Sequence, residues 1–540
     1  RLSVIGLLII LTMSYRQIIF EYPEGGGAYI VGKSNLGEWP GLVAAAALMI
    51  DYVLTVAVSV AAGMAALISA VPALLPHREA LCVAAILLVT VVNLRGVRES
   101  GQFFAVPTYI FIATIAAMLG VGAVQILFGH AARVEPLPSM APTEPLTLFL
   151  LLRAFSSGCT ALTGVEVISN GVSAFKKPEP KNAAFTMIGM AAILGTMFIG
   201  ISAMAYYFGI VPKEDETVVS QIARATFGTG PLYFLVQAST MVILILAANS
   251  SFNGFPRLAS ILARDSYMPH QMSMMGDRLV FSNGVIILGV FSCLLIVLFN
   301  GDTHALIPLY AVGVFLSFTI SQAGMVKRWL VKKGPHWEKK LLVNGIGAVT
   351  TAIATLIIAS TKFAHGAWIV IVLIPLLITF FRAIRSHYKA VSEQVALSRG
   401  HRPPMPRRNI VVLPIGGVNR AVIRAVDYAR SRSGDIRAVL VDVDPEETAR
   451  VEIQWAQWGC GVPLTVLPSP YRSVLSSLLD YLEQVLQKDQ ECWVTVVIPE
   501  ILPARWWQNI LHNQRAFMLK GALLFKDRVI LTDVPYHLTR

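Results

Sequence analysis

Eleven apolar runs divide the first 384 residues of the chain, and they limit its fold more than any other feature. A run of roughly 20 apolar residues can cross the hydrocarbon core of a bilayer as a helix. Hydrophobic residues make up 55% of the chain and charged residues 14%, whereas soluble domains have about 25% charged residues. The sequence therefore predicts a polytopic α-helical membrane protein. The runs lie near residues 2–20, 41–70, 79–94, 102–128, 146–170, 184–210, 231–251, 282–299, 303–325, 342–361 and 366–384.

The basic residues between these runs predict the orientation, because loops rich in Lys and Arg stay on the cytoplasmic side. Loops after the odd-numbered runs carry fifteen such residues, and the alternate loops carry five. The eleventh run then ends in the cytoplasm, together with everything that follows it. The fifteen are Lys33, Arg95, Arg98, Lys176, Lys177, Lys181, Arg257, Arg264, Arg278, Lys327, Arg328, Lys332, Lys333, Lys339 and Lys340. The five are Arg78, Arg133, Lys213, Arg224 and Lys362.

From residue 409 onward, short β-branched runs alternate with helical patterns. Strict alternation of strand and helix predicts a parallel, doubly wound sheet. The expected strands are Asn409–Leu413, Ile436–Val441, Leu464–Leu467, Trp493–Ile498 and Val529–Leu531. The expected helices are Arg420–Arg432, Pro445–Trp458, Tyr471–Gln487 and Trp506–Leu519. The sequence thus predicts a transmembrane domain at 1–390, a basic linker at 391–408 and a cytosolic α/β domain at 409–540.

The charge and the cysteines exclude several classes of protein. Much of the net charge of +12 lies in the short loops and in Arg399–Arg408, so membrane topology explains it without a nucleic-acid partner. The five cysteines show no paired metal-ligand spacing, so we expect no disulfide and no transition-metal site. No motif for oxidation, hydrolysis or nucleotide consumption is found in the sequence. We therefore expect no enzyme activity and no cofactor.

The fifth apolar run contains an acid. The stretch Leu151–Pro178 combines an apolar helix pattern with Gly158, Gly164 and Glu166. An ionisable side chain at the bilayer centre costs about 2.5–3.5 kcal/mol on insertion scales, so such residues usually face a cavity and mark an ion or substrate path. Transporters use interrupted helices to expose backbone groups at this depth. The pattern therefore predicts a broken transmembrane helix with a site near the bilayer midplane.

The second run carries a row of polar side chains. Tyr52, Thr55 and Ser59 share one helical face, and Asp51 precedes them. Hydroxyl oxygens near a carboxylate can replace the hydration shell of a monovalent cation. Each hydroxyl could instead bond to its own helix and aid packing, but the set together with Glu166 favours a cation site. Asp51 points about 100° away from Tyr52, so a structural partner on another helix is an equal interpretation.

Glycines Gly25–Gly27 in the first predicted cytoplasmic loop are suited either to a gate or to a plain turn. In the tail, Gly416 and Gly417 follow the first expected strand and precede a helix, which is where a phosphate can bind. With Arg472 they form a candidate nucleotide site. Trp506 and Trp507 are candidates for a nucleotide or dimer surface. Ordinary turn residues, helix starts and core aromatics remain an alternative for all of them.

Several segments carry a resemblance to a known family. In the membrane part they are EYPEGGGAYIVGKSNLG at 21–37, IDYVLTVAVSVAAG at 50–63, NLRGVRESG at 93–101, SSGCTALTGVEVISNGVSAFKKPEPKNA at 156–183 and NSSFNGFPRLASILARDSYMP at 249–269. In the tail they are NIVVLPI at 409–415, SPYRS at 469–473, WVTVVIPE at 493–500 and WWQNILHNQ at 506–514. These segments resemble the amino acid, polyamine and organocation (APC) transporter superfamily, and within it the KimA-type potassium importers of the KUP family.

The resemblance implies a LeuT-type fold, with two inverted five-helix repeats and two further helices, in which the first and sixth helices are broken. Because the broken helix here is the fifth run, eleven of the twelve helices are expected in this chain. The missing first helix would precede Arg1 and carry an Asp and a Tyr of the cation site. The family's potassium-coordinating positions fall on Tyr52, Thr55, Ser59, Thr163 and Glu166.

The resemblance further implies secondary active import of potassium by proton symport across a bacterial inner membrane. Glu166 would carry the proton, and Asp51 would be a second acid near the pathway. The tail would form a homodimer and a site for control by cyclic di-AMP. An amino acid permease of the same fold remains an alternative, because permeases also carry an acid after the equivalent break. A third hypothesis is a nucleotide sensor whose membrane part is a receptor.

Overall fold

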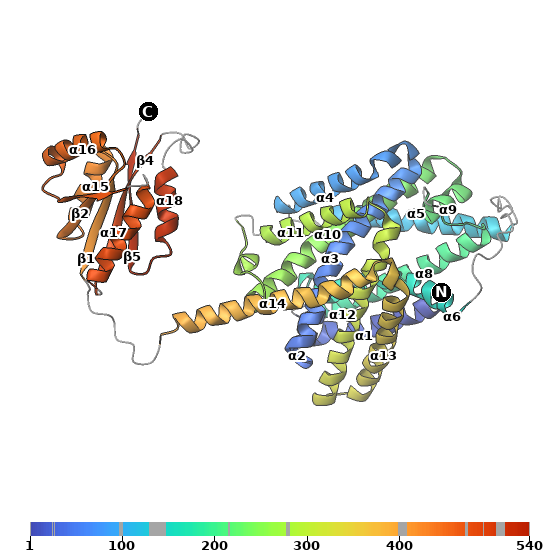
Figure 1. Ribbon diagram of the computed structural model, residues 1–540. Coiled ribbons are helices and arrows are strands. Elements are labelled where there is room, and N and C mark those ends of the chain that lie inside the picture. Colours follow the sequence, from blue (N-terminus) through green and yellow to red (C-terminus); the bar gives the residue numbers. More distant parts are fainter. Residues whose placement is uncertain are drawn as a thin grey trace. The chain divides into compact units, whose positions relative to one another are not determined.

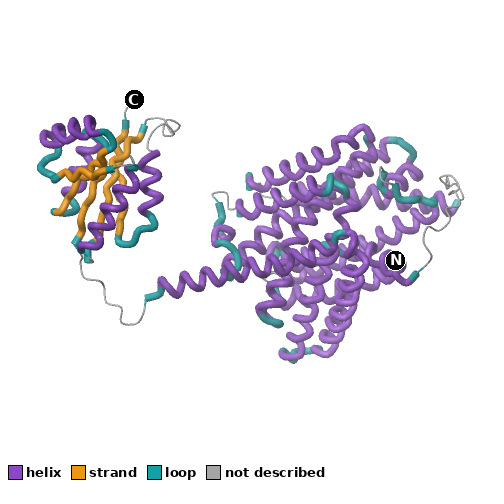
Figure 2. Tube along the Cα trace, viewed as in Figure 1, coloured by secondary structure: helices purple, strands orange, loops and turns teal. Residues whose placement is uncertain are grey.

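The computed structural model divides the chain into two compact units, Arg1–Ala396 and Leu397–Arg540. Each unit is described by itself. Helices make up the described part of the first unit, and the five described strands belong to the second (Figure 2). The structure describes residues 2–23, 25, 27–96, 101–128, 147–213, 216–276, 281–397, 408–469, 473–489, 491–503 and 514–538.

Ten described helices of the first unit are long and apolar enough to cross a membrane, and the shorter apolar helix Ser282–Leu298 accompanies them. The α-helical membrane fold predicted from the apolar runs is therefore confirmed. The α-helices are α1 (Leu2–Glu21), α2 (Gly27–Asn35), α3 (Glu38–Ala70), α4 (Arg78–Leu94), α5 (Gly101–Leu127), α6 (Leu148–Cys159), α7 (Val165–Asn170), α8 (Glu179–Tyr207), α9 (Val218–Phe227), α10 (Pro231–Arg264), α11 (Ser282–Leu298), α12 (Thr303–Val331), α13 (Trp337–Lys362) and α14 (Ala367–Val395). Short 3-10 turns lie at Pro72–His77, Thr160–Leu162, Val172–Ala174, His270–Ser273 and Phe363–His365.

Three helices continue well beyond the apolar runs that predict them. α10, α12 and α14 extend into basic segments that the sequence assigns to loops or to the linker. Arg257, Arg264, Lys327 and Arg328 consequently lie on helices, and their assignment to loops is wrong. The physical reason is that Lys and Arg are good helix formers, so a helix does not have to end where the hydrocarbon ends. A further correction concerns the first loop, most of which is the nine-residue helix α2.

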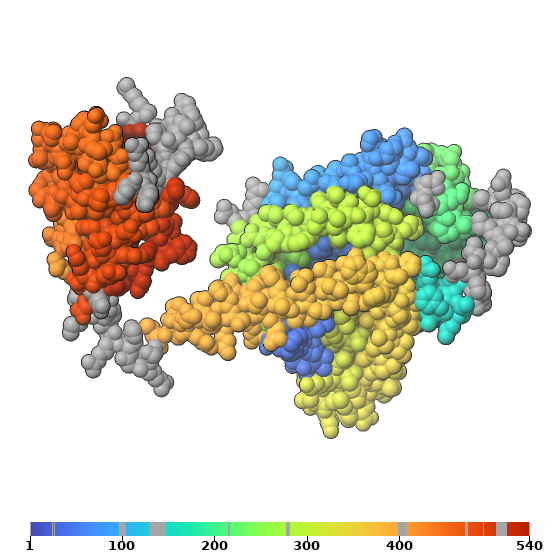
Figure 3. Space-filling model, in the orientation of Figure 1, coloured from blue at the N-terminus to red at the C-terminus, as the bar shows by residue number. Residues whose placement is uncertain are grey.

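α3 and α12 form the centre of the first unit. More than half of their spanning segments is buried, 56% for α3 and 61% for α12, against 17% for α4, α5 and α8. The outer helices present apolar side chains such as Leu88, Tyr109 and Phe185 to the surroundings, as lipid-facing helices do. Figure 1 and Figure 3 show α14, coloured yellow to orange, on the surface of the bundle. The predicted cation-site residues of the second run therefore lie on a central helix.

The second unit is a five-stranded parallel sheet in the order β3-β2-β1-β4-β5, which confirms the predicted α/β domain with a parallel sheet. The strands are β1 (Asn409–Ile415), β2 (Asp435–Asp442), β3 (Leu464–Pro468), β4 (Trp493–Leu502) and β5 (Val529–His537). The helices are α15 (Arg420–Arg430), α16 (Pro445–Trp458), α17 (Val474–Lys488) and α18 (Gln514–Leu523). One hydrophobic core joins the sheet to α15 and α16, and another joins it to α17 and α18.

Candidate functional site

The fifth apolar run is interrupted, as the sequence predicts. α6 passes into the 3-10 turn Thr160–Leu162, and α7 begins after Gly164. Gly164 has a φ of 93°, a left-handed conformation that glycine adopts at no steric cost. Thr163 is extended, with a ψ of 145°. At these two residues the backbone leaves helical geometry, so its polar groups can turn toward a side chain or a solute.

Glu166 lies in the first turn of α7 and is only 3% exposed. Its carboxylate accepts a hydrogen bond from the Gly164 amide at 3.1 Å, and the Ser169 hydroxyl donates to its carbonyl oxygen at 2.8 Å. Among the described residues, no cationic side chain forms an ion pair with Glu166. A buried carboxyl group without a fixed cation is a place for a mobile cation or a proton.

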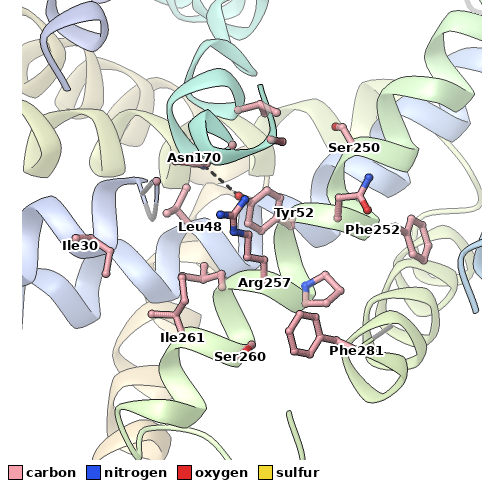
Figure 4. Close-up of a pocket in the computed structure, with 18 of the residues that line it drawn as sticks. Ile30, Leu48, Tyr52, Asn170, Ser250, Phe252, Arg257, Ser260, Ile261 and Phe281 are labelled. Atoms are coloured by element: carbon pink, nitrogen blue, oxygen red, sulfur yellow. Dashed lines mark hydrogen bonds between the residues drawn. The ribbon is translucent and has the colours of Figure 1, made fainter. Parts of the chain in front are cut away.

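α3 and α12 place hydroxyl groups around this break. The Tyr52 hydroxyl accepts a hydrogen bond from the Asn170 side-chain amide at 3.1 Å, drawn as the dashed line in Figure 4. The Thr55 hydroxyl donates to the Tyr310 hydroxyl at 3.1 Å. Tyr310 also interacts with the side chain of Thr163. The structure thus brings Tyr52, Thr55 and Thr163 together with the segment that carries the buried acid.

Two residues of this constellation, Tyr310 and Asn170, were not among the sequence-predicted site residues. Tyr310 lies two residues after Pro308 inside an apolar run, and a Pro-x-Tyr pattern at that depth is the only signal that could have found it. Asn170 ends α7, where a polar residue is ordinary. Their roles depend on contacts between distant segments, which spacing along one helix does not reveal.

Ser59 and Asp51 are placed less directly. Ser59 is half-buried one turn beyond Thr55, and no hydrogen bond joins it to the constellation within the described residues. Asp51 is 2% exposed, and one of its carboxylate oxygens has no hydrogen-bond partner in the described part of the chain. Asp51 and Glu166 interact electrostatically. The proton-coupling role of Asp51 stays a prediction.

A cavity of about 1120 Å³ extends from this constellation toward the predicted cytoplasmic face. Tyr52 and Asn170 line it together with apolar residues such as Leu48 and Ile261. Figure 4 shows Arg257 pointing toward Tyr52, and Arg257 hydrogen bonds to Ser173. A fixed positive charge repels a cation, so this side of the site is better suited to releasing a cation than to retaining one.

The segment between α1 and α2 closes against the end of α7. Gly27 has a φ of 56°, and a Cβ atom there would lie 1.8 Å from the side-chain oxygen of Asn170. Glycine adopts this backbone conformation at no steric cost, whereas a residue with a side chain would be strained there. Gly25 has a φ of 80° and lies near the same residue, while Gly26 lies outside the described residues. Close packing suits both a gate and a plain turn, so both interpretations of these glycines stay predictions.

Ion pairs hold the surroundings of this segment. Glu21 accepts from Arg328 at 2.7 Å and from Lys332 at 3.2 Å. Asp265 binds Lys33 at 2.7 Å and accepts a hydrogen bond from the Tyr29 hydroxyl. Burial and the neighbouring Asp265 raise the pKa of Tyr29 well above its usual value, so Tyr29 remains a neutral donor. The end of α1 is thereby tied to α12, and α2 is tied to the residue that follows α10.

The candidate nucleotide site is only partly described. Gly416 and Gly417 follow β1, and a Cβ atom on either would meet nothing within 4 Å, so the turn is open. Asn419 caps α15 by accepting a hydrogen bond from the Val422 amide at 3.1 Å. Arg472 lies outside the described residues, as do Trp506 and Trp507. The structure therefore leaves this site a prediction.

Comparison with known proteins assigns both units. The family described as amino acid permease matches residues 2–381, and the KimA potassium transporter C-terminal domain matches residues 407–536. Potassium transporter KimA of Bacillus subtilis (strain 168) is 44% identical over 538 residues, which are 99% of this chain and 88% of that protein. The chain belongs to the amino acid permease family and, within it, to the KimA transporters.

More distant relatives match less than two thirds of the chain. The low-affinity putrescine importer PlaP of Escherichia coli (strain K12) is 22% identical over 350 residues, 60% of this chain and 72% of that protein. The Asc-type amino acid transporter 1 of Homo sapiens is 24% identical over 355 residues, 63% of this chain and 65% of that protein. The family and the spanning helices together make the protein a multi-pass membrane transporter.

Proposed function

We propose that the protein imports potassium by proton symport through the site around Glu166, in a bacterial cell membrane, with its C-terminal domain in the cytoplasm. The 44% identity to a potassium transporter over nearly the whole chain carries the choice of substrate. The basic loops support the orientation, since they gather on the face from which the C-terminal domain follows.

The chemistry of the constellation supports a bare monovalent cation. Tyr52, Thr55, Thr163 and Tyr310 offer uncharged hydroxyl oxygens, and Glu166 offers a carboxylate. Oxygen ligands that replace the hydration shell are what potassium-selective sites provide. One carboxylate balances the charge of one potassium ion, so the occupied site is electrically neutral.

The same carboxylate supports the coupling. Glu166 is buried and has no ion-pair partner among the described side chains, so either a proton or a potassium ion has to compensate its charge. Symport requires the proton and the potassium ion to cross in the same step, so the site needs two acids. Asp51 is buried and interacts electrostatically with Glu166, so one of these acids can hold the proton while the other balances the potassium ion.

The experiment is potassium uptake into proteoliposomes by the full-length protein, with and without an inward proton gradient. We expect gradient-driven uptake that is lost in Glu166→Gln. Glu38→Gln serves as the control, because Glu38 is about half exposed and pairs with Arg385 at the surface. Uptake by Glu166→Gln that still follows the proton gradient would refute the assignment of Glu166.

The alternative is an amino acid permease, which the family match over residues 2–381 favours. Such a protein would hold a substrate carboxylate on backbone amides of the helix break, where the Gly164 amide now binds the Glu166 carboxylate. Labelled amino acids tested in the same proteoliposomes separate the two functions. Their accumulation without any potassium flux would replace the lead proposal by this one.

For the C-terminal domain we propose a homodimer with a cyclic di-AMP site at the turn Gly416–Gly417. This turn follows β1, and the strand order reverses between β1 and β4. Ligands of open parallel sheets bind outside the carboxyl ends of strands at such a reversal. Binding of labelled cyclic di-AMP to the full-length protein, compared with Gly417→Asp, tests the site, and light scattering in detergent tests the dimer. Equal binding by both proteins would exclude this turn.

A further inference from the structure

A second set of polar side chains lies inside the bundle, apart from the cavity. It runs along the junction where α13 packs against α12 and α1 (Figure 1). We call it the polar seam. Its members are Ser14, Tyr15, Gln17, Ser321, Gln322 and Asn344. Among the described residues that line the cavity, none belongs to the polar seam.

At one end of the polar seam the side chains bind one another. The Ser14 hydroxyl donates to the Asn344 side-chain oxygen at 2.6 Å, and the Asn344 amide donates to Gln17 at 2.6 Å. Gln17 also accepts from the Trp329 indole at 3.1 Å, and Asn344 donates to the Lys340 carbonyl oxygen. Gln17 is half-buried whereas Ser14 and Asn344 are fully buried. This end therefore approaches the surface on the predicted cytoplasmic face.

The inner end has polar groups that lack partners. In the described part of the chain, the hydroxyls of Tyr15 and Ser321 and both polar atoms of Gln322 make no hydrogen bond, although all three residues are fully buried. The Gln322 carboxamide lies directly against Gly347. A Cβ atom on Gly347 would be 1.4 Å from the side-chain oxygen of Gln322. The absence of a side chain at Gly347 thus makes room for an amide that the protein itself does not satisfy.

Water is the partner that these groups indicate. Buried polar groups in proteins are almost always hydrogen-bonded, either to the protein or to ordered water, and a buried water typically makes about three such bonds. Polar side chains in membrane helices also serve helix packing, and that explains Ser14, Gln17 and Asn344, which bind each other. It does not explain Gln322, whose amide reaches α13 without a bond.

The inner end faces the segment that carries the buried acid. α1 packs against α7, Tyr15 and Glu166 interact electrostatically, and the Tyr15 and Ser321 hydroxyls lie next to each other without hydrogen-bond geometry. Water between these hydroxyls would extend from Glu166 along Ser321 and Gln322 to the paired end at Gln17. This route is separate from the cavity beside Tyr52 and Asn170.

We propose that water in the polar seam carries the coupling proton from Glu166 to the cytoplasm, apart from the cavity through which potassium leaves. The inference rests on the proposed proton symport. Glu166 gives its proton to a water molecule, the water passes a proton on toward the cytoplasm, and the carboxylate that remains takes a new proton from the opposite side in the next cycle. Each hydroxyl accepts one proton and releases another, whereas the Gln322 carboxamide orients water and keeps its own protons.

The test compares two buried glutamines. Gln322→Met keeps a straight side chain of similar size and removes both polar atoms. Gln237→Met is the matched control, because Gln237 is 2% exposed and equally unpartnered among the described residues, but lies on α10 outside the polar seam. In proteoliposomes, uptake driven by a proton gradient is measured beside exchange of potassium for labelled rubidium at equal pH, since exchange requires no net proton transfer.

We expect Gln322→Met to lower gradient-driven uptake by at least about tenfold, as loss of a proton-transfer step does, with exchange unchanged within about twofold. Gln237→Met should change neither. Ser321→Ala should behave as Gln322→Met does, and Ser321→Thr should restore uptake. The proposal would be overturned if Gln322→Met left uptake unchanged. It would also be overturned if Gln322→Met and Ser321→Ala each lost uptake and exchange equally. Wild-type uptake without proton movement would instead refute the symport itself, before any variant is compared.

Discussion

Replacement of Tyr310 by Phe removes one oxygen from the proposed potassium site and leaves the ring in place. The side chain is 8% exposed, and its hydroxyl accepts a hydrogen bond from the Thr55 hydroxyl, with 3.1 Å between the two oxygens. A buried donor that loses its partner costs about 1–3 kcal/mol. If the hydroxyl binds potassium, the loss of that ligand weakens binding by a similar amount. Since 1.4 kcal/mol is a factor of ten, we expect the potassium Kd to rise by about 5- to 150-fold.

The assay needs a binding measurement as well as a transport rate, because KM equals Kd only when the transport step is slow relative to dissociation. Potassium-dependent thermal stabilisation of the purified protein gives the Kd, and initial uptake rates give the KM. Tyr109→Phe is the control, because Tyr109 is 70% exposed on α5. A Tyr310→Phe protein of wild-type stability with an unchanged Kd and KM would refute the assignment of Tyr310 as a ligand.

Two further predictions test the gate and the second unit. Gly27→Ala puts a residue with a side chain into a left-handed backbone conformation and places its Cβ atom against Asn170, so uptake should fall at least about tenfold. Gly6→Ala should be neutral, because a Cβ atom there meets nothing within 4 Å. Equal uptake by the two variants would contradict the gate. In the isolated second unit, the hydrogen bond from Arg437 holds the pKa of the Asp435 carboxyl below its usual range. The stability that this pair gives the folded unit is therefore present at neutral pH and disappears as the pH falls through the lowered pKa. Asp435→Asn should therefore lower the Tm at pH 7 by about 3–5 °C, or about 1 kcal/mol, and the difference from wild type should vanish in acid; a difference independent of pH would refute this cause.

The membrane fold was predictable because the bilayer fixes the length of an apolar run. The ends of the helices were not predictable, because nothing in a basic segment prevents a helix from continuing into water. α14 shows this most clearly, because it continues to Val395, although the apolar run ends near residue 384. The α/β unit was predictable for a different reason: its buried strands are short β-branched runs with sharp boundaries, such as Ile410–Leu413.

Residues with unusual chemistry could be found from the sequence, whereas residues that act through contacts could not. Glu166 is an acid in an apolar run, and Gly164 beside it indicates a break, so both are visible without a structure. Tyr310 is one of several tyrosines in apolar segments; the nearby Pro308 is a weak signal, and the contact with Thr55 is what assigns Tyr310 to the site. Gln322 is likewise distinguished only by its lack of a partner and by its contact with Gly347.

α12 connects the two proposed routes. Tyr310 and Ser321 are eleven residues apart on it, which corresponds to about 16 Å along the axis and almost the same face, since three turns take about 10.8 residues. Tyr310 reaches Thr55 at the cation site, and Ser321 lies beside Tyr15 in the polar seam. A rigid helix that contributes to both routes cannot move at one without moving at the other. Tilting of α12 would therefore change potassium coordination and proton access in the same step, which is what obligatory coupling of the two fluxes requires.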